Sequence, residues 1–205
     1  MKSIVIIGAG GHGKVIADIA KNVGYEKINF LDDGRKGNVG SYEIMGDTAL
    51  IDSIEADFFV AIGNGAIRKK ITNLLEEKGK RIVTLIHPAA VVAESAKIMC
   101  GTAVMAGVVI NPDATIGKSS IINTCASVDH DCIIGEYNHI SVGSHISGSV
   151  VTGENVWVGA GATISNNITI CSNVFLGAGA VVVKDINEAG TYIGVPARLD
   201  TTKDA

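Results

Sequence analysis

An aliphatic residue stands at every sixth position through the second half of the chain, and this period constrains the fold more than any other feature. From Ile86 to Val182 there are seventeen such positions, of which sixteen are Ile, Val or Leu and only Thr152 departs. An α-helix repeats every 3.6 residues and a strand every two, so neither produces this pattern over so long a stretch. A fixed period of this kind indicates a repeat architecture.

Hexads of this type predict a parallel β-helix over residues 86–205. Each hexad supplies a short strand and a corner, three hexads complete a triangular coil, and coils stack at a strand spacing of about 4.8 Å. The aliphatic position points inward. The position four residues later is also expected to point inward, since a narrow interior accepts small or β-branched side chains such as Ala96, Thr102, Ala114, Ser120, Ala126, Cys132, Ser144 and Ala162. Smooth prism faces favour self-association, and we expect a homotrimer.

The first 85 residues predict a small α/β domain. Apolar runs alternate with a glycine-rich turn and helical stretches, and they indicate strands at Ile4–Ile7, Ile28–Leu31, Phe58–Ile62 and Ile82–Ile86. Strands that alternate with helices imply a parallel sheet, here of about four strands. We therefore expect a half-Rossmann domain at residues 1–85, followed by the all-β domain at residues 86–205.

The glycines that follow the first strand, from Gly8 to Gly13, match the pattern GxGxxG, and Asp32 and Asp33 stand where an acid would bind a ribose. Alone, this motif indicates an NAD-dependent oxidoreductase. The unit is long enough for only half of a dinucleotide-binding fold, so a nucleotide-sugar, with its phosphates on the helix N-terminus, is the better fit. In a third interpretation the glycines only permit tight packing of strand against helix.

Composition excludes several other classes. The net charge is −4 and the basic residues are scattered, which argues against a nucleic-acid partner. The four cysteines show no metal-binding spacing and the N-terminus shows no signal peptide, so we expect reduced thiols, no metal and a cytoplasmic protein. The uncharged run Asn155–Val183 is interrupted by polar residues, so we expect no membrane insertion.

His130 is the candidate catalytic residue, because it lies at a predicted corner between two carboxylates, in Val128-Asp129-His130-Asp131-Cys132. Nearby negative charge raises the basicity of an imidazole, which suits a general base that takes a proton from an attacking amine or hydroxyl. The alternative is a merely polar corner. His139 lies nine residues on, half an eighteen-residue coil away, so the two histidines can share a site only if it lies between protomers.

Three other polar residues of the repeats are expected either to be solvated or to form hydrogen bonds at the corners: His145, Asn138 and Asn123. Cys125 is not favoured as an acyl-carrying nucleophile, because nothing in the sequence positions a thiolate there and direct transfer from a thioester needs no covalent enzyme intermediate.

The chain resembles the sialic acid O-acetyltransferase family of hexapeptide-repeat sugar acetyltransferases. The likeness rests on the glycine turn, on Phe30-Leu31-Asp32-Asp33, Ala61-Ile62-Gly63-Asn64 with Ile67-Arg68-Lys69-Lys70, Leu85-Ile86-His87-Pro88, the block from Asn123 to Gly135, and Gly194-Val195-Pro196-Ala197. Within the family it is most similar to the bacterial N-acetyltransferases that act on UDP-4-amino-4,6-dideoxy-N-acetylglucosamine in glycan biosynthesis.

This resemblance implies a left-handed coil, although general crossover chirality favours the opposite hand, and direct transfer from acetyl-CoA with His130 as base. It implies that Asp131, where relatives carry Glu, increases the basicity of His130. The implied nucleotide-sugar contacts are Gly10, Gly11, His12, Asp32, Asp33 and Gly63, and the implied acetyl-CoA contacts are His139, Gly148, Ala160 and Ala178. His12 would either orient the acceptor or cap the helix.

Alternative acceptors are a hydroxyl of sialic acid and a GDP-linked amino sugar of the perosamine type. A further alternative is a scaffold protein that uses the prism only for assembly.

Overall fold

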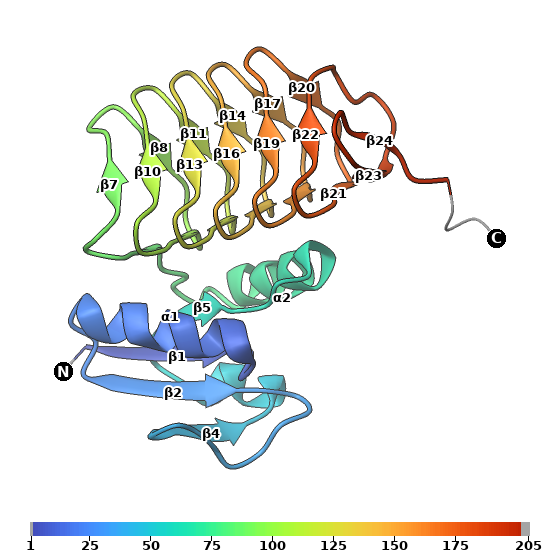
Figure 1. The fold of residues 1–205 in the computed structure, drawn as a ribbon. Coiled ribbons are helices and arrows are strands. Elements are labelled where there is room, and N and C mark those ends of the chain that lie inside the picture. The colour runs from blue at the N-terminus through green and yellow to red at the C-terminus, as the bar shows by residue number, and fades with distance from the viewer. Residues whose placement is uncertain (1, 202–205) are drawn as a thin grey trace. The chain divides into compact units, whose positions relative to one another are not determined.

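The computed structural model describes residues 2–201, which divide into two compact units with the boundary between Pro88 and Ala89 (Figure 1). The first unit is α/β and the second is a parallel β-helix. The predicted fold class is confirmed in both halves.

The first unit is built on a five-stranded sheet of order β3-β4-β2-β1-β5. Its pairs are parallel except for the antiparallel pair β3·β4. The core lies where Val5, Leu31, Phe58 and Leu75 pack together. The elements are β1 (Ser3–Ile7), α1 (Gly11–Asn22), β2 (Lys27–Leu31), β3 (Asn38–Val39), β4 (Tyr42–Gly46), the 3-10 helix η1 (Thr48–Ser53), β5 (Asp57–Val60) and α2 (Gly65–Glu77).

Two details of this sheet differ from prediction. The strands β3 and β4 extend the edge beside β2, and they were missed because Tyr42–Gly46 is half-buried and shows no clear alternation of apolar and polar residues. The run 82–86 is not one strand of this sheet. Ile82 makes an isolated bridge to Phe58, whereas β6 (Leu85–Ile86) belongs to a face of the β-helix.

The second unit winds its strands into three faces whose pairs are parallel except for the terminal pair of Gly190–Ile193 with Arg198–Leu199, and neighbouring strands lie eighteen residues apart over most of each face, as in the pair Val109↔Ser127. The first face contains β7 (Val91–Val92), β10 (Val109–Ile110), β13 (Ser127–Val128), β16 (His145–Ile146), β19 (Thr163–Ile164) and β22 (Val181–Val182). The second contains β8 (Lys97–Ile98), β11 (Thr115–Ile116), β14 (Ile133–Ile134), β17 (Val151–Thr152) and β20 (Thr169–Ile170). The third contains β6, β9 (Ala103–Val104), β12 (Ile121–Ile122), β15 (His139–Ile140), β18 (Trp157–Val158), β21 (Val174–Leu176), β23 (Gly190–Ile193) and β24 (Arg198–Leu199).

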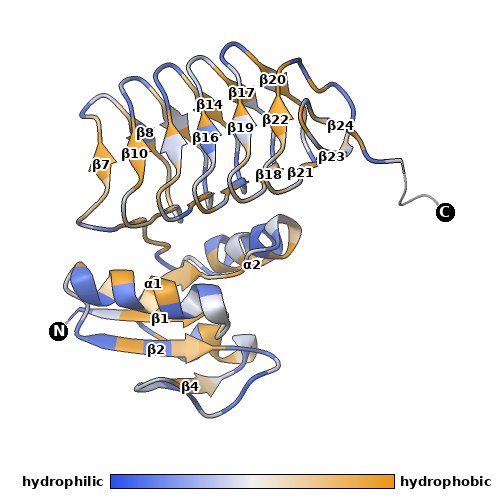
Figure 2. Cartoon of the chain, in the orientation of Figure 1, coloured by the Kyte–Doolittle hydropathy of each residue, from blue (hydrophilic) through white to orange (hydrophobic). Residues whose placement is uncertain are grey.

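The aliphatic ladder points inward as predicted. From Val104 to Val182 every ladder residue is at most 3% exposed, and only the first three, Ile86, Val92 and Ile98, are partly or largely open. Figure 2 shows the apolar strands separated by more polar corners. The coils approach closely at the glycine after the ladder residue, since a Cβ on Gly117 would lie 2.5 Å from the Gly135 carbonyl carbon.

Thr152, the one polar ladder residue, has a partner inside the coil. Its hydroxyl oxygen accepts hydrogen bonds from the Gly135 N–H at 3.1 Å and from the Asn138 amide at 2.6 Å. The other end of the Asn138 amide accepts from the Val156 N–H at 2.6 Å. Asn138 is fully buried, so the expectation of a solvated side chain was wrong, whereas the alternative of a corner-bonding residue fits: its amide lies at the corner between β14 and β15 and bonds the next coil.

Candidate active site

The predicted base, His130, lies at an exposed corner between the first and second faces of the β-helix. Strand β13 ends at Val128 and β14 begins at Ile133, so residues 129–132 form the corner. Val128 and Cys132 are fully buried, whereas the side chains of His130 and Asp131 keep 57% and 60% exposure. The inward ladder therefore directs the imidazole outward, as expected.

Asp131 holds the imidazole through the corner's backbone geometry. Its φ is 59°, a left-handed conformation that Asp adopts more readily than most residues. From there Asp131 Oδ2 lies 2.8 Å from His130 Nδ1. Because a carboxylate accepts, Nδ1 carries the proton and Nε2 is left to take one from a substrate. The hydrogen bond to Asp131 and, next, the charge of Asp129 raise the pKa of His130.

Asp129 is itself held from the preceding coil. Its Oδ1 accepts the Asn111 amide at 2.7 Å and the His130 backbone N–H at 2.8 Å. These two bonds, the Asn111 bond first, hold the pKa of Asp129 below its ordinary value. Asn111 is not among the residues predicted from the sequence, although its position eighteen residues before Asp129 places it one coil earlier at the same corner.

Gly148 packs directly against His130. It lies one coil after His130, and a Cβ on it would be 2.6 Å from His130 Cε1 and 2.7 Å from Nε2. Its φ lies outside the left-handed region, so glycine is needed here for space and not for backbone conformation. Of the four residues implied for acetyl-CoA, Gly148 is the one that the fold places against His130 within one chain.

The other three lie elsewhere on the β-helix. His139 is on β15 in the third face, where its Nε2 is 3.2 Å from the Asn123 amide and its ring stacks on Trp157 at 4.6 Å between centroids. Ala160 and Ala178 are exposed and stacked at the corner between the third and first faces. One chain thus carries His130 with Gly148 at one corner, and His139, Ala160 and Ala178 on other parts of the prism.

The glycine turn of the first unit leaves the start of α1 open. Helix α1 follows Gly10, which has no side chain to cap it, and among residues 2–201 no atom beyond the adjacent residues and the helix's own backbone lies within 4 Å of a Cβ built on Gly10 or Gly11. Gly13, by contrast, must be glycine, because a Cβ there would lie 2.1 Å from the Gly8 carbonyl oxygen. Open backbone amides at a helix N-terminus suit a phosphate.

Asp32 and Asp33, which sequence alone could not tell apart, have different partners. Asp32 accepts from the backbone N–H groups of Ala9 at 2.7 Å, Gly34 at 2.9 Å and Arg35 at 2.8 Å, so both of its oxygens are occupied. Partial burial opposes ionisation, but these hydrogen bonds keep the pKa of Asp32 below its ordinary value. Within residues 2–201 Asp33 accepts one bond, from the Thr48 N–H at 2.9 Å.

Both acids border a cavity of about 260 Å³, which is lined mainly by apolar side chains at the carboxyl end of β1 and β2 and at α2. The lining residues are Ile7, Gly8, Asp32, Asp33, Gly34, Thr48, Ile62, Ile67 and Ile71. An apolar pocket with a few polar groups at this edge of a parallel sheet is a typical small-molecule site.

His12 and Gly63 lie near Arg68 in the first unit. The buried Arg68 guanidinium donates to the carbonyls of Ile62 at 2.7 Å and Gly63 at 2.8 Å. Burial, and then the Arg68 charge, lower the pKa of His12 to about 4, so it is neutral near pH 7. Its Nε2 is buried without a hydrogen-bond partner in the described part of the chain.

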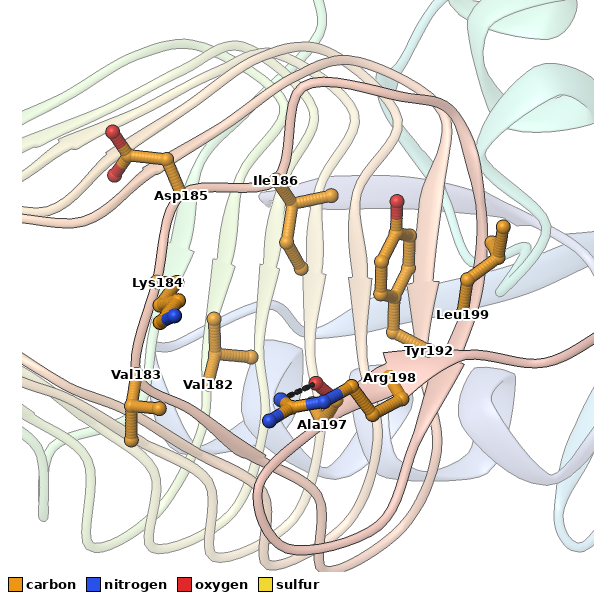
Figure 3. A pocket seen from close by; sticks show the side chains of 9 residues that line it. All are labelled: Val182, Val183, Lys184, Asp185, Ile186, Tyr192, Ala197, Arg198 and Leu199. Atoms are coloured by element: carbon orange, nitrogen blue, oxygen red, sulfur yellow. Dashed lines mark hydrogen bonds between the residues drawn. The ribbon is translucent and has the colours of Figure 1, made fainter.

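A second cavity of about 280 Å³ lies at the C-terminal end of the β-helix and contains no predicted site residue (Figure 3). It is lined by Val182, Val183, Lys184, Asp185, Ile186, Tyr192, Ala197, Arg198 and Leu199. The Arg198 guanidinium donates to the Ala197 carbonyl at 2.8 Å, and Asp185 accepts from the Thr169 N–H at 2.8 Å.

The four cysteines are free thiols, with Cys132 buried in the interior, where desolvation raises its pKa, and Cys125 exposed at a corner. Residues 2–201 contain no group of three or more His, Cys, Asp or Glu side chains that could hold a metal ion. In the same range, no helix combines the length and the apolar character needed to cross a membrane.

Comparison with known proteins agrees with this architecture. Residues 3–75 match the PglD N-terminal domain, and residues 149–184 match the bacterial transferase hexapeptide of six repeats. The UDP-N-acetylbacillosamine N-acetyltransferase of Bacillus subtilis (strain 168) is 37% identical over 113 residues, which are 52% of this chain and 52% of that protein. The matched stretch therefore spans about half the length of that curated relative.

Solved structures match nearly the full chain. The acetyltransferase domain of PglB from Neisseria gonorrhoeae is 41% identical with a TM-score of 0.95, covering 98% of this chain and 100% of that one, and a second structure holds acetyl coenzyme A. PerB from Caulobacter crescentus, in complex with CoA and GDP-perosamine, is 37% identical with a TM-score of 0.94, covering 98% of both chains. From this likeness in sequence and fold, the chain belongs to the PglD-like family of sugar acetyltransferases, in which a PglD N-terminal domain precedes a left-handed β-helix of hexapeptide repeats.

Proposed function

We propose that this chain is an acetyl-CoA-dependent N-acetyltransferase that acetylates the 4-amino group of a UDP-linked 4-amino-4,6-dideoxy sugar. The observation that carries the proposal is the exposed imidazole of His130, whose Nδ1 is 2.8 Å from Asp131 and whose ring packs on Gly148. The family and the relatives that act on UDP- and GDP-linked amino sugars support this choice over an oxidoreductase.

In the proposed reaction, the amine nitrogen forms a bond to the acetyl carbonyl carbon and the carbon–sulfur bond breaks. The amine proton passes to His130 Nε2, and the sulfur leaves as the thiol of CoA by taking that proton from the imidazolium. Asp131 keeps the Nδ1 proton in place during this exchange and stabilises the imidazolium that forms. Such a base contributes about 10²–10⁴-fold to the rate.

We assign the nucleotide-sugar to the open turn at Gly10 and Gly11 and to the cavity beside Asp33. Asp32 would act indirectly, because its oxygens already bind the backbone of the turn and of the following loop. Asp33 has one oxygen available to a ribose or a base. The neutral His12 and the loop at Gly63 would border the same ligand.

We further propose that the active site is completed in a homotrimer. His130 and Gly148 lie at one corner of the prism, whereas His139, Ala160 and Ala178 lie on the third face and at another corner. A thioester bound along His139, Ala160 and Ala178 of one copy would reach His130 only if that imidazole came from a neighbouring copy.

The test measures CoA thiol release with acetyl-CoA and each acceptor separately: the UDP-linked amino sugar, GDP-perosamine and sialic acid. We expect release with the UDP-linked sugar, abolished in His130→Ala and retained at reduced rate in Asp131→Ala. The GDP-linked sugar is the second candidate, because the PerB complex with GDP-perosamine matches the whole chain. Release only with sialic acid, or binding of NADH without binding of CoA, would refute the proposal.

A further inference from the structure

We infer that Asn111 is a positioning residue for this reaction, acting on His130 through Asp129, and the inference rests on the proposed function. Asn111 lies one coil before the corner that carries the base. Its backbone N–H donates to the Val128 carbonyl at 2.9 Å, which ties its coil to the residue just before that corner. The stacking of the coils therefore places its side chain beside Asp129.

The contact concentrates two donors on one oxygen. Asp129 Oδ1 accepts the Asn111 amide at 2.7 Å from the coil before and the His130 N–H at 2.8 Å from its own corner. The carboxylate thus bridges the preceding coil to the peptide that carries the imidazole. Without Asn111, Asp129 would keep only the bond to its neighbour and could turn into solvent, where its charge is screened.

The chemistry of the donor matters because this corner is acidic. Asp129 and Asp131 flank His130, and Asp113 lies one coil before Asp131, whereas residues 147–150 of the next coil carry no titratable side chain. A Lys or Arg at position 111 would also hold Asp129, but its charge would offset the negative field that keeps the imidazole basic. A neutral amide fixes the carboxylate and leaves that field intact.

The experiment compares steady-state kinetics of wild type, Asn111→Ala, Asn111→Asp, Asp129→Ala and the double variant Asn111→Ala/Asp129→Ala. Asn111→Ala is expected to lower kcat roughly tenfold with little change in KM for either substrate, as expected when a base is misaligned and binding is intact. Asn111→Asp should be worse, because it sets a second carboxylate against Asp129. In the Asp129→Ala background, Asn111→Ala should cost nothing further, since its effect passes through Asp129.

The matched control is Asn155→Gly. Asn155 donates an amide hydrogen bond to Asn173 across one coil at 2.9 Å, at a different corner, and its φ of 55° suits glycine. This variant should keep kcat within about twofold, because it touches no group near His130. Unchanged kcat in Asn111→Ala, or losses that multiply in the double variant, would overturn the inference.

A second readout does not depend on turnover. The His130 imidazole is titrated by NMR in wild type and Asn111→Ala, and its pKa should fall toward 6.5 in the variant as Asp129 loses its anchor. An unchanged midpoint contradicts the role of Asn111. If wild type transfers no acetyl group to any acceptor, the proposed function fails, while the titration still decides whether Asn111 acts on His130.

Discussion

Replacing Gly148 by Ala tests the geometry of the proposed base, His130, most directly. The added Cβ would stand 2.6 Å from His130 Cε1 and 2.7 Å from Nε2, whereas carbon contacts settle at about 3.5–4.0 Å. The imidazole must therefore move by about 1 Å. Because its side chain is 57% exposed, the ring can swing outward at little cost to the fold, but it then loses its alignment with Asp131.

A displacement of about 1 Å at a reacting group costs on the order of 10²-fold in rate. We expect Gly148→Ala to lower kcat by roughly this factor while the melting temperature stays near that of wild type, since φ at this position allows Ala. The assay is CoA thiol release at saturating concentrations of both substrates, with circular dichroism melting on the same samples. In a His130→Ala background the same substitution should have no further effect on kcat.

The reasoning is refuted if Gly148→Ala keeps kcat within about threefold of wild type, because the ring would then not need its present position. It is also refuted if the loss persists undiminished in the His130→Ala background. A rise confined to KM for acetyl-CoA would instead assign Gly148 to thioester binding alone.

Three further outcomes follow from single contacts. Asp131 raises the pKa of His130, so Asp131→Asn should move the acidic limb of the pH profile of kcat/KM to lower pH and lower its plateau. An acidic limb at the same pH as in wild type would contradict this prediction. Thr152→Val leaves the buried Asn138 amide and a backbone N–H without their acceptor, so the free energy of unfolding measured by chemical denaturation should fall by about 1–3 kcal/mol. A free energy close to that of wild type would mean that the interior repacks and would contradict this prediction. The pKa of His12 is about 4 in the folded chain and about 6.5 in the unfolded chain, so the free energy of unfolding should rise with pH between these values, by at most about 3 kcal/mol. Urea unfolding at pH 4.5 and pH 7 measures this difference, and His12→Phe should reduce it.

Much of the site was predictable because the coil converts sequence spacing into spatial position. A period of six fixes which side chains face inward, so the outward direction of His130 and Asp131 followed from the burial of Val128 and Cys132. The eighteen-residue coil also places Asn111 one coil before this corner and Gly148 one coil after it. The interior position of Asn138 was predictable from the same period, since it stands four residues after the ladder residue Ile134, but its hydrogen-bond partners Thr152 and Val156 were not.

The sequence by itself determined the two domain types, the corner that bears His130 and the glycine turn, because each depends on local pattern and period. Only the tertiary structure separated Asp32, whose two oxygens bind backbone groups of the turn and the following loop, from Asp33, which among the described residues accepts a single backbone bond, from Thr48. It also revealed the β3·β4 edge and the neutral, buried His12. These features depend on contacts between residues that are distant in the sequence, because such contacts decide which hydrogen-bond partners a group has and how far it is desolvated.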